Sequence, residues 1–315
     1  MTGQVKPAEY SIVIPVYNSE ASLVELHSRI QTVMKGISDN YEIFFVNDSS
    51  KDNSWEILKS LRNSDIRVKI IHLLRNFGEH NAVFCGLHYC SGNIVIILDD
   101  DLQNPPEEIP KFIEKIQAGS WVVFGRYRQK MHSRSENFLS AMFQHLMHTI
   151  LQYPRNIYIS SFTAMRGEVA RNIINLKSSY PFIPALIIQS APMDKITNAD
   201  VLHQERKVGR STYTPFKYFQ LFLNLVINFS SLPLIFVGTF GFMISILSIG
   251  YGVYIFFQRL LNPDFGIIGW NSLIVATTFL GGMILLSMAI IGEYLRRILA
   301  EISYGRPYIV READV

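Results

Sequence analysis

The first 125 residues alternate between short apolar runs of strand type and longer segments of helical type. The strand-like runs are Ser11–Val16, Tyr41–Asn47, Val68–Leu74, Asn93–Leu98 and Trp121–Gly125. The segments with apolar residues at helical spacing are Ala21–Ile37, Ser54–Arg62, His80–Cys90 and Pro106–Gln117. This alternation predicts an α/β domain with a mostly parallel, Rossmann-like sheet and helices on both faces.

Polar residues follow these strand-like runs at the point where each run ends. In a mostly parallel sheet, ligands bind beyond the carboxyl ends of the strands, so residues at these positions share one edge of the sheet. We therefore expect a single binding site built from several strand ends. The polar positions are Tyr17-Asn18, Asn47-Asp48, Arg75-Asn76, Asp99–Asp101 and Arg126.

The acidic run Asp99–Asp101 is the strongest chemical signal among these positions. Three adjacent carboxylates repel one another, which is costly at a strand end unless a cation balances them. Asp99 and Asp101 can both face one site, where their hard oxygen atoms favour Mg²⁺ or Mn²⁺ bridging the diphosphate of a nucleotide. The alternative is an acidic turn that caps the helix after Pro106.

Two further clusters offer groups suited to a nucleoside. After the first strand, Pro15–Asn18 and Glu20 can place an aromatic ring against a base and polar groups near a ribose. After the second strand, Asp48 and Asp52 can accept hydrogen bonds from a base or ribose. Ordinary structural explanations exist for both clusters: an asparagine turn before a helix, and helix capping by Asp52 or Ser54.

Two long stretches near the C-terminus contain no residue that is charged at neutral pH. Ser231–Phe257 and Asn271–Gly292 lack Asp, Glu, Lys, Arg and His, and roughly 20 apolar residues cross a bilayer as a helix. The mean hydropathy of the chain, +0.18, is high for a wholly soluble enzyme. We expect two transmembrane helices, although a buried hairpin of a soluble protein is the alternative.

The distribution of basic residues predicts the topology. Seven of them flank the two stretches: Lys207, Arg210, Lys217, Arg296, Arg297, Arg306 and Arg311. The connecting loop has Arg259, so both outer flanks are expected in the cytoplasm. The predicted parts are a cytoplasmic catalytic domain (1–213), a juxtamembrane amphipathic helix (214–230), a first span (231–257), an extracytoplasmic loop (258–270), a second span (271–295) and a cytoplasmic tail (296–315). The segment 214–230 either lies in the membrane interface or packs against the domain.

A net charge of +3 without a long Lys/Arg run argues against a nucleic-acid partner. Arg126, Arg128 and Arg134 follow the fifth strand and can gather a phosphate by bidentate hydrogen bonds, or they form a basic surface that faces lipid headgroups. His80 and His203 can contact a diphosphate, or they are satisfied structural residues.

The ordered combination of these segments resembles family 2 glycosyltransferases with a GT-A fold. The segments are PVYN, VNDSSKDNS, RNFGEHNAVFCGL and LDDDLQNPPEEIP. Within that family the chain is similar to the dolichyl-phosphate mannose synthase group, whose bacterial polyprenyl-phosphate transferases carry two C-terminal membrane helices. It is similar to the undecaprenyl-phosphate formamido-arabinose transferases in DLQNPPEEIP, HQERKVGRSTY and GEYLRRI. The resemblance covers nearly the whole chain.

The resemblance implies a role for each matching position. The nucleotide sugar would lie among Pro15, Tyr17, Asn18, Glu20, Asp48, Asp52, His80, Asp100, His203, Arg206 and Ser211. The catalytic set would be Asp99 and Asp101, as ligands of the metal, with Gln103 and Arg126. The acceptor phosphate would lie near Arg126, Arg128, Arg134 and Ser140.

The chain departs from the family pattern at four positions. Ser19 stands where an acidic residue is usual, and Asn47 replaces the usual first Asp of the second motif. No acidic residue precedes Phe162, and Glu136 occupies the position of a basic residue four places before Ser140. The first two departures affect nucleoside binding, and the last affects the acceptor contacts.

The expected activity is inverting transfer of a single sugar from a nucleotide diphosphate sugar, UDP-linked, to polyprenyl (undecaprenyl) phosphate. The product would serve cell-envelope glycan synthesis or lipopolysaccharide modification, at a bacterial inner membrane and from a homo-oligomer in contact with membrane lipids. A processive polysaccharide synthase is one alternative, but such enzymes carry Gln-x-x-Arg-Trp, whereas this chain has His203-Gln204-Glu205-Arg206-Lys207. An inactive membrane adaptor with the same fold is another.

Overall fold

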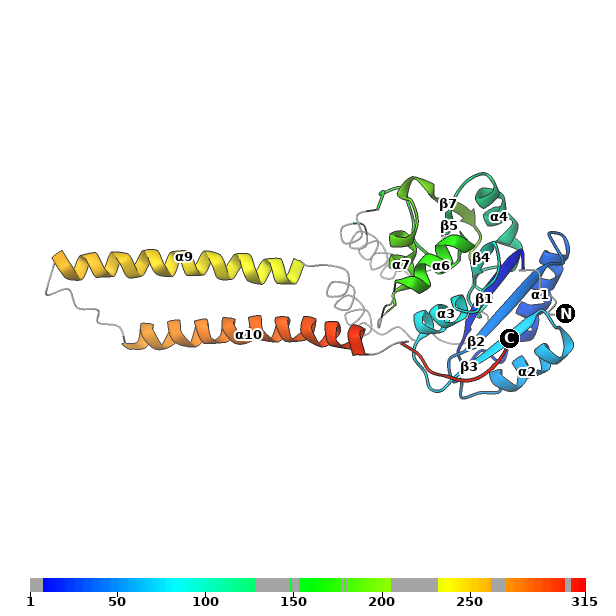
Figure 1. Cartoon of the computed structure of the whole chain (residues 1–315), viewed down its shortest axis with the longest axis horizontal. Helices are drawn as coiled ribbons and strands as arrows, with labels where there is room; N and C mark the ends of the chain where they lie inside the picture. The colour runs from blue at the N-terminus through cyan, green and yellow to red at the C-terminus, as the bar shows by residue number, and fades with distance from the viewer. Residues whose placement is uncertain are drawn as a thin grey trace, which may run out of the picture. The chain divides into compact units, whose positions relative to one another are not determined.

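The computed structural model of the protein describes residues 8–127, 148, 153–176, 178, 181–204, 232–261, 270–303 and 307–315. The chain forms two compact units, one made of Met1–Tyr213 with Tyr304–Val315 and the other of Thr214–Ser303 (Figure 1). The predicted juxtamembrane helix (214–230) and residues 262–269 of the predicted loop lie outside the described residues.

The first unit is built on an eight-stranded sheet with the order β7-β5-β6-β4-β1-β2-β3-β8. The strands are β1 (Tyr10–Val16), β2 (Tyr41–Asn47), β3 (Val68–Leu73), β4 (Ile94–Ile97), β5 (Val122–Tyr127), β6 (Thr163–Arg166), β7 (Ile196–Val201) and β8 (Val310–Asp314). Parallel pairs join β1 to β2 and β4, β2 to β3, and β5 to β7, whereas β6 and β8 run antiparallel to their neighbours. The predicted mostly parallel sheet is confirmed.

Helices cover both faces of this sheet. They are α1 (Leu23–Lys35), α2 (Ser54–Ser64), α3 (Glu79–Leu87), α4 (Ile109–Gln117), α6 (Gly167–Asn175) and α7 (Ile183–Ser190), with short 3-10 turns η1 (Pro106–Glu108) and η2 (Met193–Lys195). Ile12 and Ile14 of β1 share one buried cluster with residues of α1, α2 and α4. Val13 points to the other face, where a Cβ added to Gly86 of α3 would come within 2.5 Å of it. The glycine therefore lets α3 pack directly on β1.

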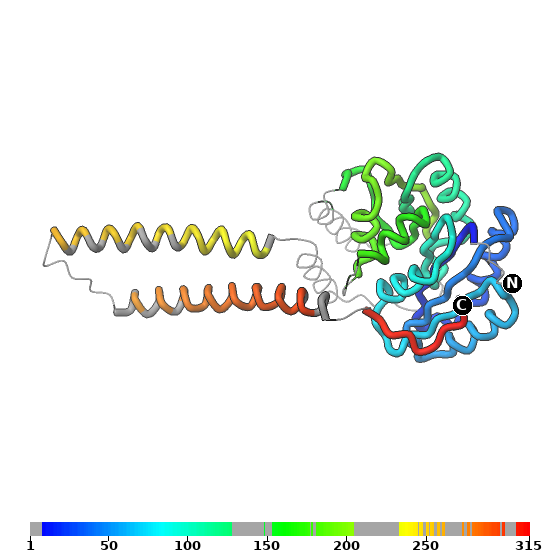
Figure 2. Tube along the Cα trace, in the orientation of Figure 1, coloured from blue at the N-terminus to red at the C-terminus, as the bar shows by residue number. Residues whose placement is uncertain are grey.

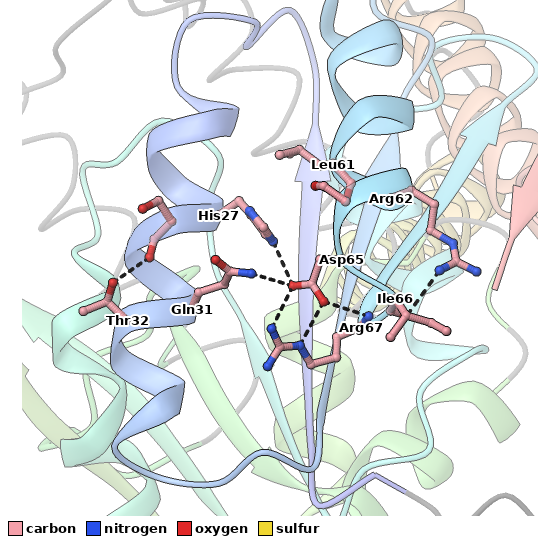
Figure 3. Close-up of polar contacts among 10 residues, drawn as sticks. His27, Gln31, Thr32, Leu61, Arg62, Asp65, Ile66 and Arg67 are labelled. Carbon is pink, nitrogen blue, oxygen red and sulfur yellow. Dashed lines mark hydrogen bonds and ion pairs between the residues drawn. The ribbon is translucent and has the colours of Figure 1, made fainter.

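An ion cluster ties α1 and α2 to β3 at the amino end of that strand, opposite the edge where we expect the site (Figure 3). Asp65 accepts hydrogen bonds from Gln31 Nε2 at 2.7 Å and Arg67 Nε at 2.9 Å, and it lies 3.1 Å from His27 Nε2. Burial alone would raise the pKa of Asp65, but the bonds from Arg67, Gln31 and His27 hold it well below its usual range. This carboxylate is balanced by its neighbours and stabilises the fold.

The second unit contains two long helices, α9 (Leu232–Leu261) and α10 (Trp270–Ser303), which lie side by side (Figure 1). Large apolar side chains such as Phe242 and Leu285 are exposed on them. Within the part of the chain that the structure describes, one window, Phe279–Arg296, is long and apolar enough to cross a membrane. In α9 the corresponding apolar segment, Pro233–Ile244, is shorter.

The chain returns from α10 to the sheet of the first unit. The tail pairs antiparallel with β3, so that His72 faces Glu312, and the strand lies along the edge of the domain (Figure 2). Leu74 N donates to Ile309 O at 2.9 Å, and Arg62 forms an ion pair with Asp314 at 2.9 Å. The end of the segment 296–315 thus belongs to the sheet of the first unit, a pairing that its sequence does not predict.

Candidate functional site

The loops that follow β4, β1 and β2 are neighbours, because β1 lies between the other two strands. Tyr17 N donates to Asp100 Oδ2 at 3.0 Å, and Asn18 N donates to Ser50 Oγ at 3.0 Å. Pro15 is buried inside β1, whereas Tyr17 is 42% exposed. Three of the polar clusters identified at strand ends therefore meet at one edge of the sheet.

Reciprocal hydrogen bonds connect the loop after β1 to the loop after β2. Asn18 Oδ1 accepts from Lys51 N at 2.7 Å. Glu20 Oε2 accepts from Asn53 N at 2.8 Å, and Asp52 Oδ2 accepts from Glu20 N at 3.1 Å. These side chains brace the backbone on which a nucleoside would rest; that they also contact a nucleoside stays a prediction.

Asp48 holds the start of α3. Its two carboxylate oxygens accept from the backbone amides of Phe77 and Gly78, both at 2.7 Å, and the residue is 2% exposed. Burial raises the pKa of Asp48, and the two amide bonds oppose that effect. Gly78 has a φ of 95°, which residues with a side chain rarely adopt. Asp48 thereby fixes the helix whose first two residues are Glu79 and His80.

The imidazole of His80 is a neutral group in this setting. Burial lowers the pKa of His80 to about 4, so the ring carries no charge at neutral pH. The ring packs edge-on against Phe182, with the ring centroids 4.9 Å apart. His80 can therefore donate or accept a hydrogen bond at a diphosphate, but it cannot balance the charge of one.

At the acidic run that follows β4, burial and neighbouring carboxylates raise the pKa of several acidic side chains. Burial, followed by the charges of Glu79 and Asp101, raises the pKa of Asp99 well above its usual range. Burial raises the pKa of Asp100 to about 6, and burial followed by the charge of Asp101 raises the pKa of Glu79. Directly after the run, Leu102 has a φ of 62°, a backbone conformation that bulky residues rarely adopt and that is often found at functional sites.

Two serines that stand where the family pattern has acidic residues both donate to this run. Ser19 Oγ donates to Asp100 Oδ2, and Ser161 Oγ donates to Asp99 Oδ2 at 2.6 Å. The side-chain amide of Asn104 donates to the same Asp99 oxygen at 2.7 Å. Both departures thus lower the number of carboxylates here and supply neutral donors instead.

The donor set fits a hard divalent cation. No Lys or Arg of the described residues forms an ion pair with Glu79, Asp99 or Asp100, although burial penalises their charges. Across the described ranges, no three His, Cys, Asp or Glu residues form a complete metal-ligand cluster. Asp99 and Asp101 would therefore hold Mg²⁺ or Mn²⁺ together with ligands from outside the protein, such as diphosphate oxygens and water.

The opposite side of the site is formed by the ends of β5 and β7. Arg126 Nε donates to Asp200 Oδ1 at 2.7 Å. Gln204 N donates to the backbone oxygen of Gln103 at 2.9 Å, so the segment that contains His203 reaches the loop of the acidic run. The remaining predicted residues of this side lie outside the described residues: Arg128, Arg134, Ser140, Arg206 and Ser211.

Sequence reasoning missed several residues of the site. Glu79 lies in a segment used for the resemblance, and Asn104 lies in another, but neither was assigned a role. Ser161 was noted as part of a departure rather than as a partner of Asp99. Tyr127 and Asp200 gave no local signal, because their partners lie on other strands.

Comparisons with known proteins agree with the fold and identify the family. The model of "Glycosyl transferase family 2" matches residues 11–174. An uncharacterized glycosyltransferase of Bacillus subtilis is 36% identical over 97% of this chain and 94% of the relative. An undecaprenyl-phosphate 4-deoxy-4-formamido-L-arabinose transferase of Shewanella sediminis is 31% identical over 96% of this chain and 91% of the relative. The chain belongs to glycosyl transferase family 2, and it is a glycosyltransferase.

Two further similarities are informative. A prophage-derived bactoprenol glucosyl transferase of Shigella flexneri is 30% identical over 96% of this chain and 97% of the relative. Glucosyl-3-phosphoglycerate synthase from Mycobacterium tuberculosis, solved with Mn²⁺, UDP and phosphoglyceric acid, superimposes with a TM-score of 0.51 at 17% identity, covering 70% of this chain and 78% of that one. The predicted GT-A-like α/β fold is confirmed by this likeness.

Proposed function

We propose that the protein transfers a single sugar from a UDP-sugar to the phosphate of a polyprenyl lipid, with inversion at the anomeric carbon. The observation that carries the proposal is the half-buried acidic run at the end of β4, beside the loops of β1 and β2, where burial and neighbouring carboxylates raise the pKa of Asp99 and Asp100. Relatives named for transfer to undecaprenyl phosphate and to bactoprenol support the acceptor class.

On the donor side, Asp99 and Asp101 would hold a divalent cation against the diphosphate, with Gln103 beside them. A cation bound there neutralises charge that develops on the departing diphosphate, which lowers the barrier to transfer. His80 would add a neutral hydrogen bond, and the braced loops that contain Tyr17 and Asp52 would support the nucleoside.

On the acceptor side, no strong general base is required. A lipid monophosphate has a second pKa of about 6, so it is largely dianionic at neutral pH and can attack directly. Arg126 would bind this phosphate: its bond to Asp200 uses Nε, which leaves the two terminal nitrogens in a geometry suited to a bidentate contact. Arg128, Arg134 and Ser140 are proposed as further contacts.

The helices α9 and α10 would anchor the catalytic domain at the membrane that contains the acceptor. We place the spans at 231–257 and 271–295, with the catalytic domain and the C-terminus in the cytoplasm of a bacterial cell. The candidate span Phe279–Arg296 and the exposed apolar side chains of both helices support this arrangement. Polyprenyl phosphate is a membrane lipid, so an anchored enzyme meets its acceptor at the bilayer surface.

The direct test is incubation of the purified full chain with undecaprenyl phosphate, Mn²⁺ and a panel of nucleotide sugars, followed by mass spectrometry of the lipids. We expect one new lipid that carries a single sugar and that forms with a UDP-linked donor. Formation of a polymer, or release of free sugar with no lipid product across the panel, would contradict the proposal.

A further inference from the structure

The carboxylate of Asp99 is held through one of its two oxygens. Ser161 Oγ donates to Asp99 Oδ2 at 2.6 Å, and Asn104 Nδ2 donates to the same oxygen at 2.7 Å. Two donors on one oxygen prevent the carboxylate from rotating. Among the described residues no hydrogen bond reaches Oδ1, so this second oxygen is the one presented to a ligand.

Asn104 also connects Asp99 to β5. The residue is 2% exposed, and its Oδ1 accepts a hydrogen bond from Tyr127 OH at 2.9 Å. When Asp99 is ionised, it can only accept, so the amide nitrogen must face Asp99 and the amide oxygen must face the tyrosine. Asn104 therefore has one orientation, which Tyr127 fixes from the other side.

The sheet topology explains why these residues meet. Strand β6 lies between β4 and β5 and runs antiparallel to both, so its amino end lies beside their carboxyl ends. Ser161 precedes β6, Asp99 follows β4, and Tyr127 ends β5 next to Arg126. The network thus spans three strands, from the proposed metal ligand to the residue beside the proposed acceptor contact.

We propose that Asn104, Ser161 and Tyr127 are positioning residues that orient Asp99 for the cation and couple it to the strand that contains Arg126. This inference rests on the proposed function, because it concerns the same cation. Partners of metal ligands typically change metal affinity by about 10-fold to 100-fold when they are removed. Ser161 and Asn104, which touch Asp99, should have the larger effects, and Tyr127, which acts through Asn104, a smaller one.

The test measures Mn²⁺ affinity directly, by titration calorimetry on the full chain in detergent with saturating UDP and without acceptor. Ser161→Ala and Asn104→Ala should each weaken Mn²⁺ binding by about 10-fold or more. Tyr127→Phe, which removes the hydroxyl alone, should weaken it in the same direction by a few-fold. Ser160→Ala is the matched control, since Ser160 Oγ donates to Phe162 O and not to Asp99.

A double-mutant cycle separates positioning from general damage to the fold. In an Asp99→Ala background, Ser161→Ala should cause no further loss of Mn²⁺ affinity, because the group that it positions is already absent. Melting temperatures of Ser161→Ala and Ser160→Ala should fall by similar amounts. Unchanged Mn²⁺ affinity in both Ser161→Ala and Asn104→Ala would overturn the inference and leave the proposed function intact. Failure of the unmodified protein to bind Mn²⁺ with UDP would overturn both.

Discussion

Carboxylates occur at the ends of both β2 and β4, but their surroundings differ. Asp48, after β2, receives two backbone amide bonds at 2.7 Å, and Asp52 in the same loop accepts from Glu20 N. At the end of β4, Asp99 lies near the charges of Glu79 and Asp101, and it accepts hydrogen bonds from two side chains. The carboxylates after β2 accept hydrogen bonds that hold the loops, whereas the carboxylates after β4 lie close enough together that a cation would balance their charge.

The two surroundings imply different roles for acidic residues at the same edge of the sheet. A carboxylate bonded to backbone amides holds a loop, so its loss should lower stability first. A carboxylate that lies beside other carboxylates costs free energy in the absence of a cation, so its loss should affect binding and catalysis first. Substitutions that keep the shape and remove the charge can separate the two roles.

The largest effect is expected at the acidic run. Asp101→Asn should lower transfer activity by about 1,000-fold, because a catalytic cation contributes several kcal/mol and each 1.4 kcal/mol is roughly tenfold in rate. The melting temperature should not fall, because one of several repelling charges is removed and the asparagine oxygen can still accept the hydrogen bond from Gln103 N. Activity is measured by lipid product formation and stability by thermal melting in detergent.

The matched control for this variant is Asp194→Asn, an exposed acidic residue in η2 at the amino end of β7. It should leave activity and melting temperature unchanged. Near-normal turnover of Asp101→Asn would remove the distinction between the two groups of carboxylates, and with it the assigned metal ligand.

A smaller effect, of a different kind, is expected at Asp48. Asp48→Asn replaces one accepting oxygen with an NH₂ group that faces a backbone amide, which should destabilise the domain by about 2 kcal/mol. For a domain of this size that corresponds to a fall of roughly 5 °C in melting temperature. Mn²⁺ affinity in the folded protein should change far less than in Asp101→Asn. Loss of Mn²⁺ binding with an unchanged melting temperature would reverse the roles that we assign.

The smallest effect is the expected change of stability with pH at His72. The distance between His72 Nδ1 and Asn47 Nδ2 is 2.8 Å, and His72 pairs with Glu312 of β8. Burial, followed by the charge of Arg311, lowers the pKa of His72, with Glu312 opposing and Lys59 adding to the shift. The unfolded chain therefore binds a proton more readily than the folded one. The contribution of neutral His72 to the free energy of unfolding should be complete above about pH 6.5, and it should decrease as the pH falls below that value.

Melting temperatures of the unmodified chain and of His72→Gln, measured from pH 8 to pH 5.5, test this pH dependence. The decline at low pH should be shallower in His72→Gln, because glutamine does not titrate. Identical slopes for the two proteins would show that the protonation of His72 is not linked to folding.

The first five strands could be predicted from the sequence because each is a buried apolar run, and a helical pattern follows each of the first four. Strand β6 was missed because its sequence, TAMR, lacks a strongly apolar run and because it is inserted between strands that precede it in the chain. Strand β8 was missed because its sequence, VREAD, is charged and mostly exposed. It pairs with the edge of β3 that β2 leaves open, and no local sequence pattern predicts such a pairing.

Site residues that are adjacent in the sequence could be predicted, whereas contacts between residues far apart in the sequence could not. Asp99 and Asp101 were identified because the acidic run is contiguous and follows a strand. Ser161 is 62 residues from Asp99, and Tyr127 is 23 residues from Asn104, so their contacts exist only once the sheet has formed. Asp48 was identified as a site residue, but its bonds to Phe77 and Gly78 required the structure.

The most direct test of the account is anomalous diffraction at the manganese edge from crystals of the full chain grown with Mn²⁺ and UDP. We predict one strong anomalous peak between the carboxylates of Asp99 and Asp101 and the diphosphate of the nucleotide. Bound UDP with no peak at that position, or with an acidic run that faces away from the diphosphate, would contradict it.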